Sequence, residues 1–268
     1  MAKAKKTTCP KCGQEYDIMF SRCPCCHEPN NERPESRVSY LPISRQIPLF
    51  LVGLIGINVL AVIISLIVAP SIKDDDALRY VLINSINYAI LFIVDMLLLI
   101  NYFHELIIPF KKGRTYLAGL IGFAVLLGGS TLITYLMELA VPSAGTGENQ
   151  SVAIQMILRN PAVSIIILGF IGPLVEELTY RVGLFTLCKR ASPVLAYILT
   201  TLVFAVIHID FFSDNIINEL VALPDYLFAG LMFSLLYDKE GFGASYLAHV
   251  GNNLFSVISI IITGAQNG

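Results

Sequence analysis

The feature that most constrains this chain is a series of long apolar runs, which begins near Ile47 and continues almost to the last residue. A helix needs about 20 apolar residues to cross the hydrocarbon core of a bilayer. A chain in lipid must also satisfy its backbone hydrogen bonds internally, and runs of this length do so as helices. Only 14% of the 268 residues are charged, whereas soluble domains average about 25%. The sequence therefore predicts an all-α fold, a polytopic bundle of transmembrane helices.

We predict about seven spans, of which the fifth is short and the sixth contains Pro224. A small cysteine-rich domain (1–28) and a polar linker (29–46) precede the membrane domain (47–268). The predicted spans are 47–69, 80–101, 116–141, 161–187, 193–208, 220–237 and 242–263.

The distribution of charge predicts the orientation. Lysine and arginine collect before the first span, between the second and third, and between the fourth and fifth, whereas the alternate links are mainly acidic. Cytoplasmic loops carry an excess of lysine and arginine. We therefore predict an integral protein of the cell (plasma) membrane with a cytoplasmic N-terminus, and seven spans would place the C-terminus outside.

Five of the six cysteines lie within residues 9–26, in two Cys-Pro-x-Cys turns. Two such turns can supply a closed tetrahedral site for Zn²⁺, which leaves no position for water and is therefore structural. A disulfide-linked cluster is the alternative, disfavoured in a reducing cytoplasm. Cys25 and His27 are spare and could substitute as ligands in the resulting zinc ribbon. The predicted ligands are Cys9, Cys12, Cys23 and Cys26.

Two adjacent carboxylates interrupt the fourth apolar segment. An ionisable residue inside a transmembrane helix costs about 2.5–3.5 kcal/mol on insertion scales and usually has a function. Glu177 and Arg181 are one helical turn apart and can pair, while Glu176 lies about 100° around the helix and can face a cavity. Alternatively, the helix ends at Val175 and the glutamates lie in headgroup water.

Two histidines and an asparagine occur in later apolar segments. Phe204 and His208 are one turn apart, as are His249 and Asn253. One histidine in an apolar helix is usually structural, but this set in separate spans indicates a site. Counted at about 1.5 Å per residue from the cytoplasmic ends, His249 lies about 10 Å deep and His208 about 22 Å deep. Their convergence then requires tilted helices, a fifth helix that starts outside the membrane, or re-entrant structure.

The ordered patterns E-E-x-x-x-R, F-x-x-x-H and H-x-x-x-N resemble the signature of the CPBP family. That family includes the type II CAAX prenyl proteases and bacterial relatives linked to bacteriocin processing and self-immunity. The resemblance covers about 161–264 and leaves out the zinc ribbon. It implies an intramembrane endopeptidase that hydrolyses a peptide bond in a membrane-associated or prenylated substrate. The catalytic residues it implies are Glu176, Glu177, Arg181, His208, His249 and Asn253.

By this resemblance Glu176 activates water, with His208 helping to hold it. His249 and Asn253 donate to the oxyanion, and the Glu177–Arg181 pair braces the site. A metal-dependent version stays open, because one glutamate and two histidines are also the ligands of a catalytic zinc site. A Ser245–His249 dyad is a weaker interpretation, since the glycine frame around the serine is incomplete.

Functions other than that of a peptidase are also compatible with the sequence. A non-proteolytic membrane scaffold or a bacteriocin self-immunity or regulatory protein could keep the same fold. A transporter is disfavoured because the candidate groups lie only in the later half of the chain. We expect a membrane-associated protein or peptide as substrate, approached from the cytoplasmic side. The ribbon leaves room for a protein partner, nucleic acid is not expected, and the architecture is typical of a prokaryotic protein.

Overall fold

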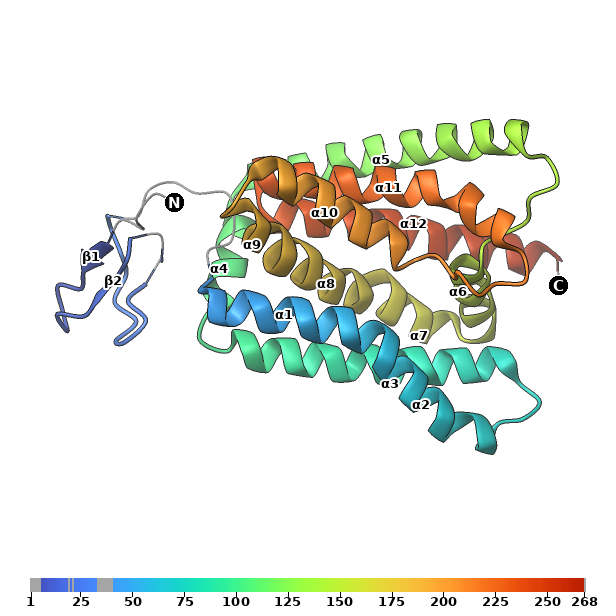
Figure 1. Ribbon diagram of the computed structural model, residues 1–268, viewed down its shortest axis with the longest axis horizontal. Coiled ribbons are helices and arrows are strands. Elements are labelled where there is room, and N and C mark those ends of the chain that lie inside the picture. The colour runs from blue at the N-terminus through green and yellow to red at the C-terminus, as the bar shows by residue number, and fades with distance from the viewer. Residues whose placement is uncertain (1–5, 19, 21, 33–40, 268) are drawn as a thin grey trace.

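The structure is a computed structural model that describes residues 6–18, 20, 22–32 and 41–267, the last three by their backbone only. Residues 33–40, the larger part of the predicted linker, lie outside the described residues. The small N-terminal domain contains an antiparallel pair of strands, β1 (Lys6–Thr8) and β2 (Glu15–Asp17). The ring of Phe20 lies 5.9 Å from that of Tyr102, so this domain sits against one end of the helical domain (Figure 1).

Residues 41–267 are mainly helical, which confirms the predicted fold class. Six helical stretches among the described residues are long and apolar enough to cross a membrane. Their ranges are Ile43–Ser71, Asp76–Leu99, Gly113–Ala140, Pro161–Lys189, Ile216–Glu240 and Phe242–Gly264. The predicted fifth span is shorter than the others, a helix over Pro193–Val206.

Several stretches consist of more than one element. The first comprises α1 (Ile43–Ile55), the π-helix η1 (Gly56–Leu60), α2 (Ala61–Val68) and the 3₁₀ turn η2 (Ala69–Ser71). The fourth comprises α7 (Pro161–Ile166), η4 (Ile167–Ile171), α8 (Gly172–Glu177), η5 (Leu178–Phe185) and α9 (Thr186–Lys189), where η4 and η5 are π-helices. The others are α3 (Asp76–Leu99), α5 (Gly113–Ala140), α10 (Pro193–Val206), α11 (Ile216–Glu240) and α12 (Phe242–Asn267).

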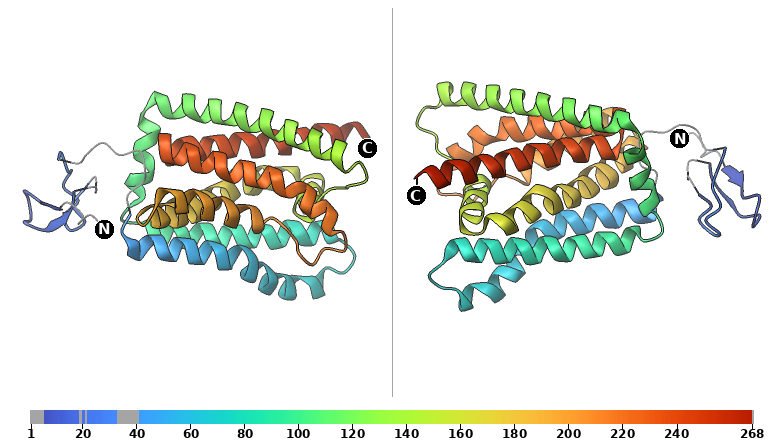
Figure 2. Two further views of the ribbon diagram at one scale, coloured as in Figure 1. Left: turned by 45° about the horizontal axis from the view of Figure 1, so that its top comes forward. Right: turned by 180° about the vertical axis from the view of Figure 1, so that it is seen from behind.

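Short helices close the two ends of the bundle (Figure 2). α4 (Phe103–Ile107) and the 3₁₀ turn η3 (Ile108–Lys111) lie at the end near the N-terminal domain, whereas α6 (Glu148–Arg159) lies at the opposite end, as does the C-terminus. These two ends are called here the ribbon end and the α6 end.

The fourth stretch is the buried centre of the bundle. More than half of its most apolar window is buried, against about a fifth in the other stretches. It packs on α1 through η5, and on α12 through η4 and α8. Glycine allows the close approach, because a Cβ atom on Gly53 of α1 would lie 1.8 Å from Thr179 Oγ1. The residues that are costly in lipid are therefore enclosed by protein.

Ion pairs join the helices at both ends. At the ribbon end Arg114 pairs with Glu240 at 2.6 Å, and Lys189 pairs with Asp238. At the α6 end Arg159 pairs with Asp75 at 2.9 Å. The hydrogen bond from Arg159 and the backbone N–H of Leu78 hold the pKa of Asp75 below its ordinary value.

Candidate active site and metal centre

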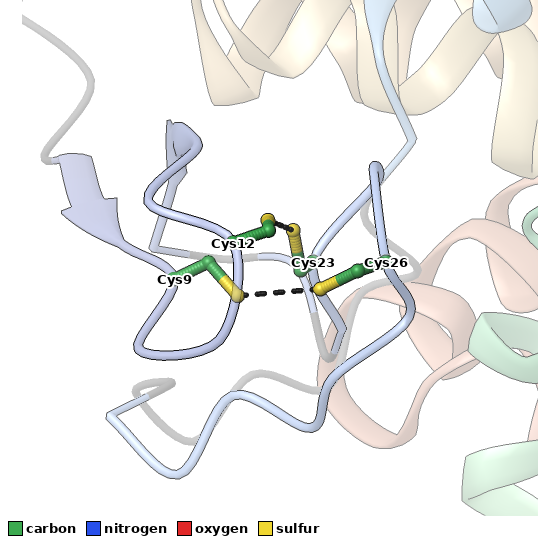
Figure 3. A group of neighbouring side chains, drawn as sticks. All are labelled: Cys9, Cys12, Cys23 and Cys26. Atoms are coloured by element: carbon green, nitrogen blue, oxygen red, sulfur yellow. Dashed lines mark hydrogen bonds between the residues drawn. The ribbon is translucent and has the colours of Figure 1, made fainter.

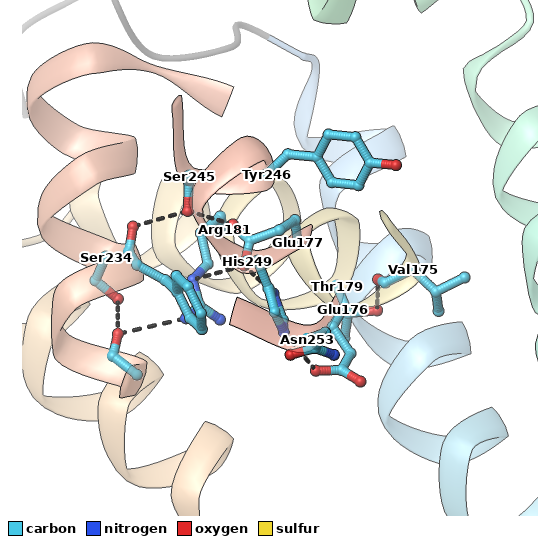
Figure 4. A network of polar contacts seen from close by, with 12 residues as sticks. Val175, Glu176, Glu177, Thr179, Arg181, Ser234, Ser245, Tyr246, His249 and Asn253 are labelled. Carbon is cyan, nitrogen blue, oxygen red and sulfur yellow. Dashed lines mark hydrogen bonds and ion pairs between the residues drawn. The ribbon is translucent and has the colours of Figure 1, made fainter. Parts of the chain in front are cut away.

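Glu177 lies at the centre of a buried polar network (Figure 4). Its Oε1 is 3.0 Å from His249 Nδ1 and 3.6 Å from Arg181 Nε. Ser245 Oγ donates a hydrogen bond of 2.5 Å to Oε2. Neither the Glu177 nor the Arg181 side chain is exposed, and a buried carboxylate needs partners of this kind to carry its charge. The geometry of Glu177 suits a group that orients its neighbours.

Glu176 faces a cavity, with only 8% of its surface exposed. The Tyr88 hydroxyl of α3 donates to its Oε1 at 3.1 Å. Its Oε2 lies 3.7 Å from His249 Nε2 and 3.9 Å from His208 Nε2. The alternative in which the helix ends at Val175 is wrong, because α8 includes both glutamates and continues into η5.

His208 lies in the turn that follows α10, and its ring turns back along the helix. Its Nδ1 is 2.6 Å from the backbone carbonyl of Phe204, and its ring stacks on Tyr226 at a centroid distance of 4.6 Å. A carbonyl can only accept, so Nδ1 carries the proton and Nε2 faces Glu176 as an acceptor in the neutral ring. This backward turn reduces the difference in depth that counting residues gives for His208 and His249.

Aromatic rings hold the other charged side chains in place. The His249 ring stacks on Phe233 with centroids 4.2 Å apart. The Arg181 guanidinium lies 4.6 Å from the ring centre of Phe204 and 5.2 Å from that of Phe233. Contacts between a cation and an aromatic face are favourable where water is excluded. Arg181 is thereby held between two rings and the carboxylate of Glu177.

Asn253 lies one turn beyond His249 on α12 and lines the same cavity. Its Nδ2 donates to the carbonyl of Leu168 at 3.0 Å. Leu168 belongs to the π-helix η4, and single π turns often occur at functional sites because they change which carbonyls the helix uses. The amide of Asn253 is therefore fixed beside Glu176 by a local irregularity of the fourth stretch.

The cavity in front of Glu176 has a volume of about 570 Å³. It extends from the site along α5, α11 and α12 to the loop 141–147 and α6. Gly145 and Thr146 of this loop are exposed, so the cavity reaches the surface at the α6 end. The sequence led us to expect access from the cytoplasmic side, where the ribbon was predicted, but the cavity opens at the other end. The distribution of charge among the loops does not predict at which end of a helical bundle a cavity opens.

The structure also brings in side chains that no motif indicates. Tyr88 binds Glu176, and Tyr226 stacks on His208 and accepts a hydrogen bond of 3.0 Å from Asn149 of α6. Ser245 is not paired with His249, because both side chains face Glu177. A tyrosine in an apolar helix is too common to serve as a signal in one sequence.

The four predicted zinc ligands form a compact cluster (Figure 3). All four sulfur atoms lie within 4.8 Å of one another. The Cys9–Cys26 and Cys12–Cys23 sulfur distances are 3.4 and 3.6 Å, close to the separation of about 3.8 Å for thiolates bound at about 2.3 Å to one tetrahedral ion. All six cysteines are free thiols, which argues against the disulfide alternative. The cluster can hold a metal ion, and its fourth position is filled by Cys26 and not by Cys25.

The local backbone explains this cluster. The N–H of Cys9 bonds the carbonyl of Gln14, and the N–H of Cys23 bonds that of Glu28, so each Cys-Pro-x-Cys turn is closed at its base. Tyr16 of β2 is the buried residue beside the sulfurs. The hydrophobic contacts are few, and small domains of this kind often fold only with a bound metal.

The carboxylate and two histidines of the membrane site are more widely spaced. Among the described residues, the cysteine cluster alone brings the ligand atoms of three or more metal-binding side chains within 4.8 Å of one another. The two Nε2 atoms nevertheless both face Glu176.

The fold and the site together define an integral membrane protein with an ionisable cluster buried among its helices. Residues 158–255 match the sequence model of a family described as type II CAAX prenyl endopeptidase Rce1-like. This segment carries all six implied catalytic residues, and the match agrees with the resemblance stated from the motifs. By its description, that family consists of CAAX-type endopeptidases.

The chain is also similar to an uncharacterized protein of Mycoplasma capricolum subsp. capricolum, at 30% identity over 164 residues. These residues are 57% of this chain and 46% of that protein, so the chain spans less than half the length of this relative. No solved structure matches the chain.

Proposed function

We propose that the protein is an intramembrane endopeptidase that hydrolyses a peptide bond of a membrane-associated protein or peptide at Glu176. One observation carries this proposal: Glu176 Oε2 faces the Nε2 atoms of both His208 and His249, at 3.9 and 3.7 Å, at the inner end of a cavity. A base, a group that orients water and a donor for the oxyanion are what peptide hydrolysis requires.

In the first step Glu176 removes a proton from a water molecule while the water oxygen bonds to the carbonyl carbon. The second O–H of that water donates a hydrogen bond to Nε2 of His208, because the Nδ1–H of this ring already bonds the carbonyl of Phe204. Tyr88 donates to the other oxygen of Glu176 and fixes the orientation of the carboxylate. The proton on Glu176 then passes to the leaving amine as the carbon–nitrogen bond breaks.

The negative oxygen of the tetrahedral intermediate requires preorganised donors. Glu177 accepts Nδ1–H of His249, so Nε2 donates only when the ring is an imidazolium. The carboxylates of Glu176 and Glu177 face its two nitrogens and hold the ring in this orientation. Asn253 is the second donor, with one amide hydrogen held by Leu168 and the other free for the substrate.

Arg181 and Glu177 act as positioning residues in this scheme. Arg181 is enclosed by Phe204 and Phe233, and it balances the charge of Glu177 without reaching the cavity. Glu177 in turn fixes the ring of His249. The pair keeps the donor aimed at the site throughout the reaction.

The four cysteines of the N-terminal domain would hold zinc, which supplies folding energy there and no catalysis. Because thiols are kept reduced in the cytoplasm and are oxidised to disulfides in many outer compartments, we place this domain in the cytoplasm. Lys111, Lys112 and Arg114 follow the second span near the same end, in agreement with the excess of positive charge on cytoplasmic loops. The protein then spans the plasma membrane with its ribbon inside.

The test compares the termini of membrane and secreted peptides, by mass spectrometry, between the wild type and Glu176→Gln at matched expression. We expect a specific set of termini to be lost, since a general base contributes about 10²- to 10⁴-fold. Glu148→Gln is the control, because it removes an exposed carboxylate of α6. If Glu176→Gln leaves all termini unchanged while deletion of the protein still has an effect, the protein is a scaffold and this proposal is wrong.

A further inference from the structure

The cavity extends from the site in one direction only. Its walls are the halves of α5, α11 and α12 that approach the α6 end, and its mouth is the loop 141–147. The charged loops around Lys111 and Arg190 lie at the ribbon end and do not line it. With the ribbon in the cytoplasm, the mouth opens on the outer side of the membrane.

The wall of the cavity is acidic. Glu138 and Asp225 line it together with Glu176, and no lysine or arginine is present among the described residues that line it. Asp225 differs from Glu138 in being largely enclosed: its Oδ1 atom is buried and has no hydrogen-bond partner among the described residues. The Ser130 hydroxyl is a neighbour of the carboxyl group but cannot neutralise it. A buried carboxylate without a cation is costly, and a cationic ligand would remove that cost.

Asp225 has a defined position relative to the reacting groups. Ala222, Asp225, Ala229 and Phe233 line the cavity from one face of α11. Phe233 stacks on His249, and Asp225 lies eight residues before it, about 12 Å along the helix toward the α6 end. An extended peptide advances about 3.3 Å per residue. A peptide lying along this face therefore places its third or fourth residue from the reacting bond beside Asp225.

We propose that the cavity admits an extended peptide from the α6 end, on the outer side of the membrane, and that Asp225 binds a lysine or arginine side chain three or four residues from the cleaved bond. This inference rests on the proposed peptidase function and adds to it a direction of entry and a substrate class. The substrates are cationic peptide segments at the outer membrane face.

The direction of entry can be tested without any activity. Ser143→Cys places a thiol on the exposed mouth loop, beside residues that line the cavity but not among them. Lys111→Cys places one at the ribbon end. A membrane-impermeant maleimide added to intact cells should label Ser143→Cys, while Lys111→Cys should react only after permeabilisation. The reverse pattern would overturn entry from outside.

Recognition of a cationic side chain by Asp225 is tested at the cleavage sites whose peptide termini are lost in Glu176→Gln. A synthetic peptide spanning the most abundant of these cleavage sites is compared with a copy in which the nearby lysine or arginine is replaced by glutamine. We expect the purified wild type to prefer the basic peptide by about 10- to 100-fold in kcat/KM, the range for a hydrogen bond between charged groups. In Asp225→Asn we expect this preference to disappear because kcat/KM falls for the basic peptide and stays the same for the glutamine copy.

Two variants control this experiment. Asp225→Glu keeps the charge and should keep the preference, and Asp214→Asn removes an exposed carboxylate at the same end of the bundle and should change nothing. If Glu176-dependent termini lack a basic residue within five positions, or if Asp225→Asn slows both peptides equally, recognition by Asp225 is wrong while the peptidase function stands. If no terminus depends on Glu176, both proposals fail together.

Discussion

The N-terminal domain and the centre of the helical bundle each bring together groups that can carry negative charge, and they differ in what balances that charge. In the small domain four sulfur atoms converge, and as thiolates they would be neutralised by a bound metal ion. In the bundle Glu177 pairs with Arg181 and accepts hydrogen bonds from His249 and Ser245, all from the same chain. The first region would therefore depend on the metal content of its surroundings, whereas the second depends on the exactness of its own packing.

Removal of the metal is expected to separate the two regions most strongly. Structural zinc contributes about 10–16 kcal/mol to folding in zinc-finger peptides, so a strong chelator should unfold residues 6–32 and leave the helical bundle intact. The purified protein should contain one zinc ion, measured by elemental analysis. Proteolysis within the small domain should follow chelation, with unchanged far-ultraviolet circular dichroism of the helices.

The cysteines provide the control for this prediction. Cys9→Ser should lose the ion, whereas Cys25→Ser should retain it, because Cys25 is exposed and outside the cluster. If the bundle loses its helices together with the metal, the two regions are one folding unit and the comparison fails.

Glu177→Gln tests the bundle's internal neutralisation. The substitution leaves the guanidinium of Arg181 buried without its ion-pair partner, and breaking a buried pair in this way costs about 3–5 kcal/mol. Unfolding of the purified protein in detergent measures the loss. The double variant Glu177→Gln/Arg181→Met removes both charges and should recover most of the stability. An equal loss in both variants would show that packing, and not charge, holds this centre together.

Gly53→Ala tests how exact the packing is. The added Cβ atom would lie 1.8 Å from Thr179 Oγ1, and overpacking of this kind costs about 1–3 kcal/mol. Gly128→Ala is the matched control, because nothing lies within 4 Å of its Cβ position and alanine favours a helix by about 1 kcal/mol. The zinc content should be the same in both variants. A Gly53→Ala protein as stable as the wild type would show that α1 and η5 can separate without loss.

The smallest effect is expected at Asp75, at the edge of the bundle. Its pKa is lowered by the hydrogen bond from Arg159, so the ionised form is favoured in the folded state. The stabilisation is then complete above the unfolded pKa of about 3.9 and is lost as the pH falls below it. Thermal unfolding at pH 7 and pH 3 should differ less for Asp75→Asn than for the wild type. If the difference between pH 7 and pH 3 is the same in both proteins, the Asp75–Arg159 pair does not contribute to stability.

The sequence was sufficient to predict the helical bundle, because apolar runs of this length have no other stable form in lipid. It also indicated which polar residues converge, since an ionisable group such as Glu176 stays in an apolar helix only with partners. The choice of Cys26 over Cys25 followed from the equal spacing of the two turns. These signals are local in the chain.

The remaining features depend on contacts between distant segments. The depth of His208 could not be counted from the sequence, because its ring turns back to Phe204. The π-helices η4 and η5 follow no sequence rule available from one chain. Tyr88 and Asp225 acquire their places only when α3 and α11 pack around the fourth stretch. The direction in which the cavity opens is a property of the whole bundle.

The ion pairs described at the two ends differ from the central pair in one further respect. Arg114–Glu240 and Arg159–Asp75 are partly exposed, whereas neither side chain of Glu177–Arg181 has any exposed area. Dissolved ions screen exposed charges over about 10 Å at 0.1 M and reach buried ones much less. Raising the ionic strength therefore loosens the ends of the helices, including the α6 end where the cavity opens, while the groups around Glu176 keep their arrangement. The salt concentration of the medium therefore changes access to the site without changing the arrangement of the groups around Glu176.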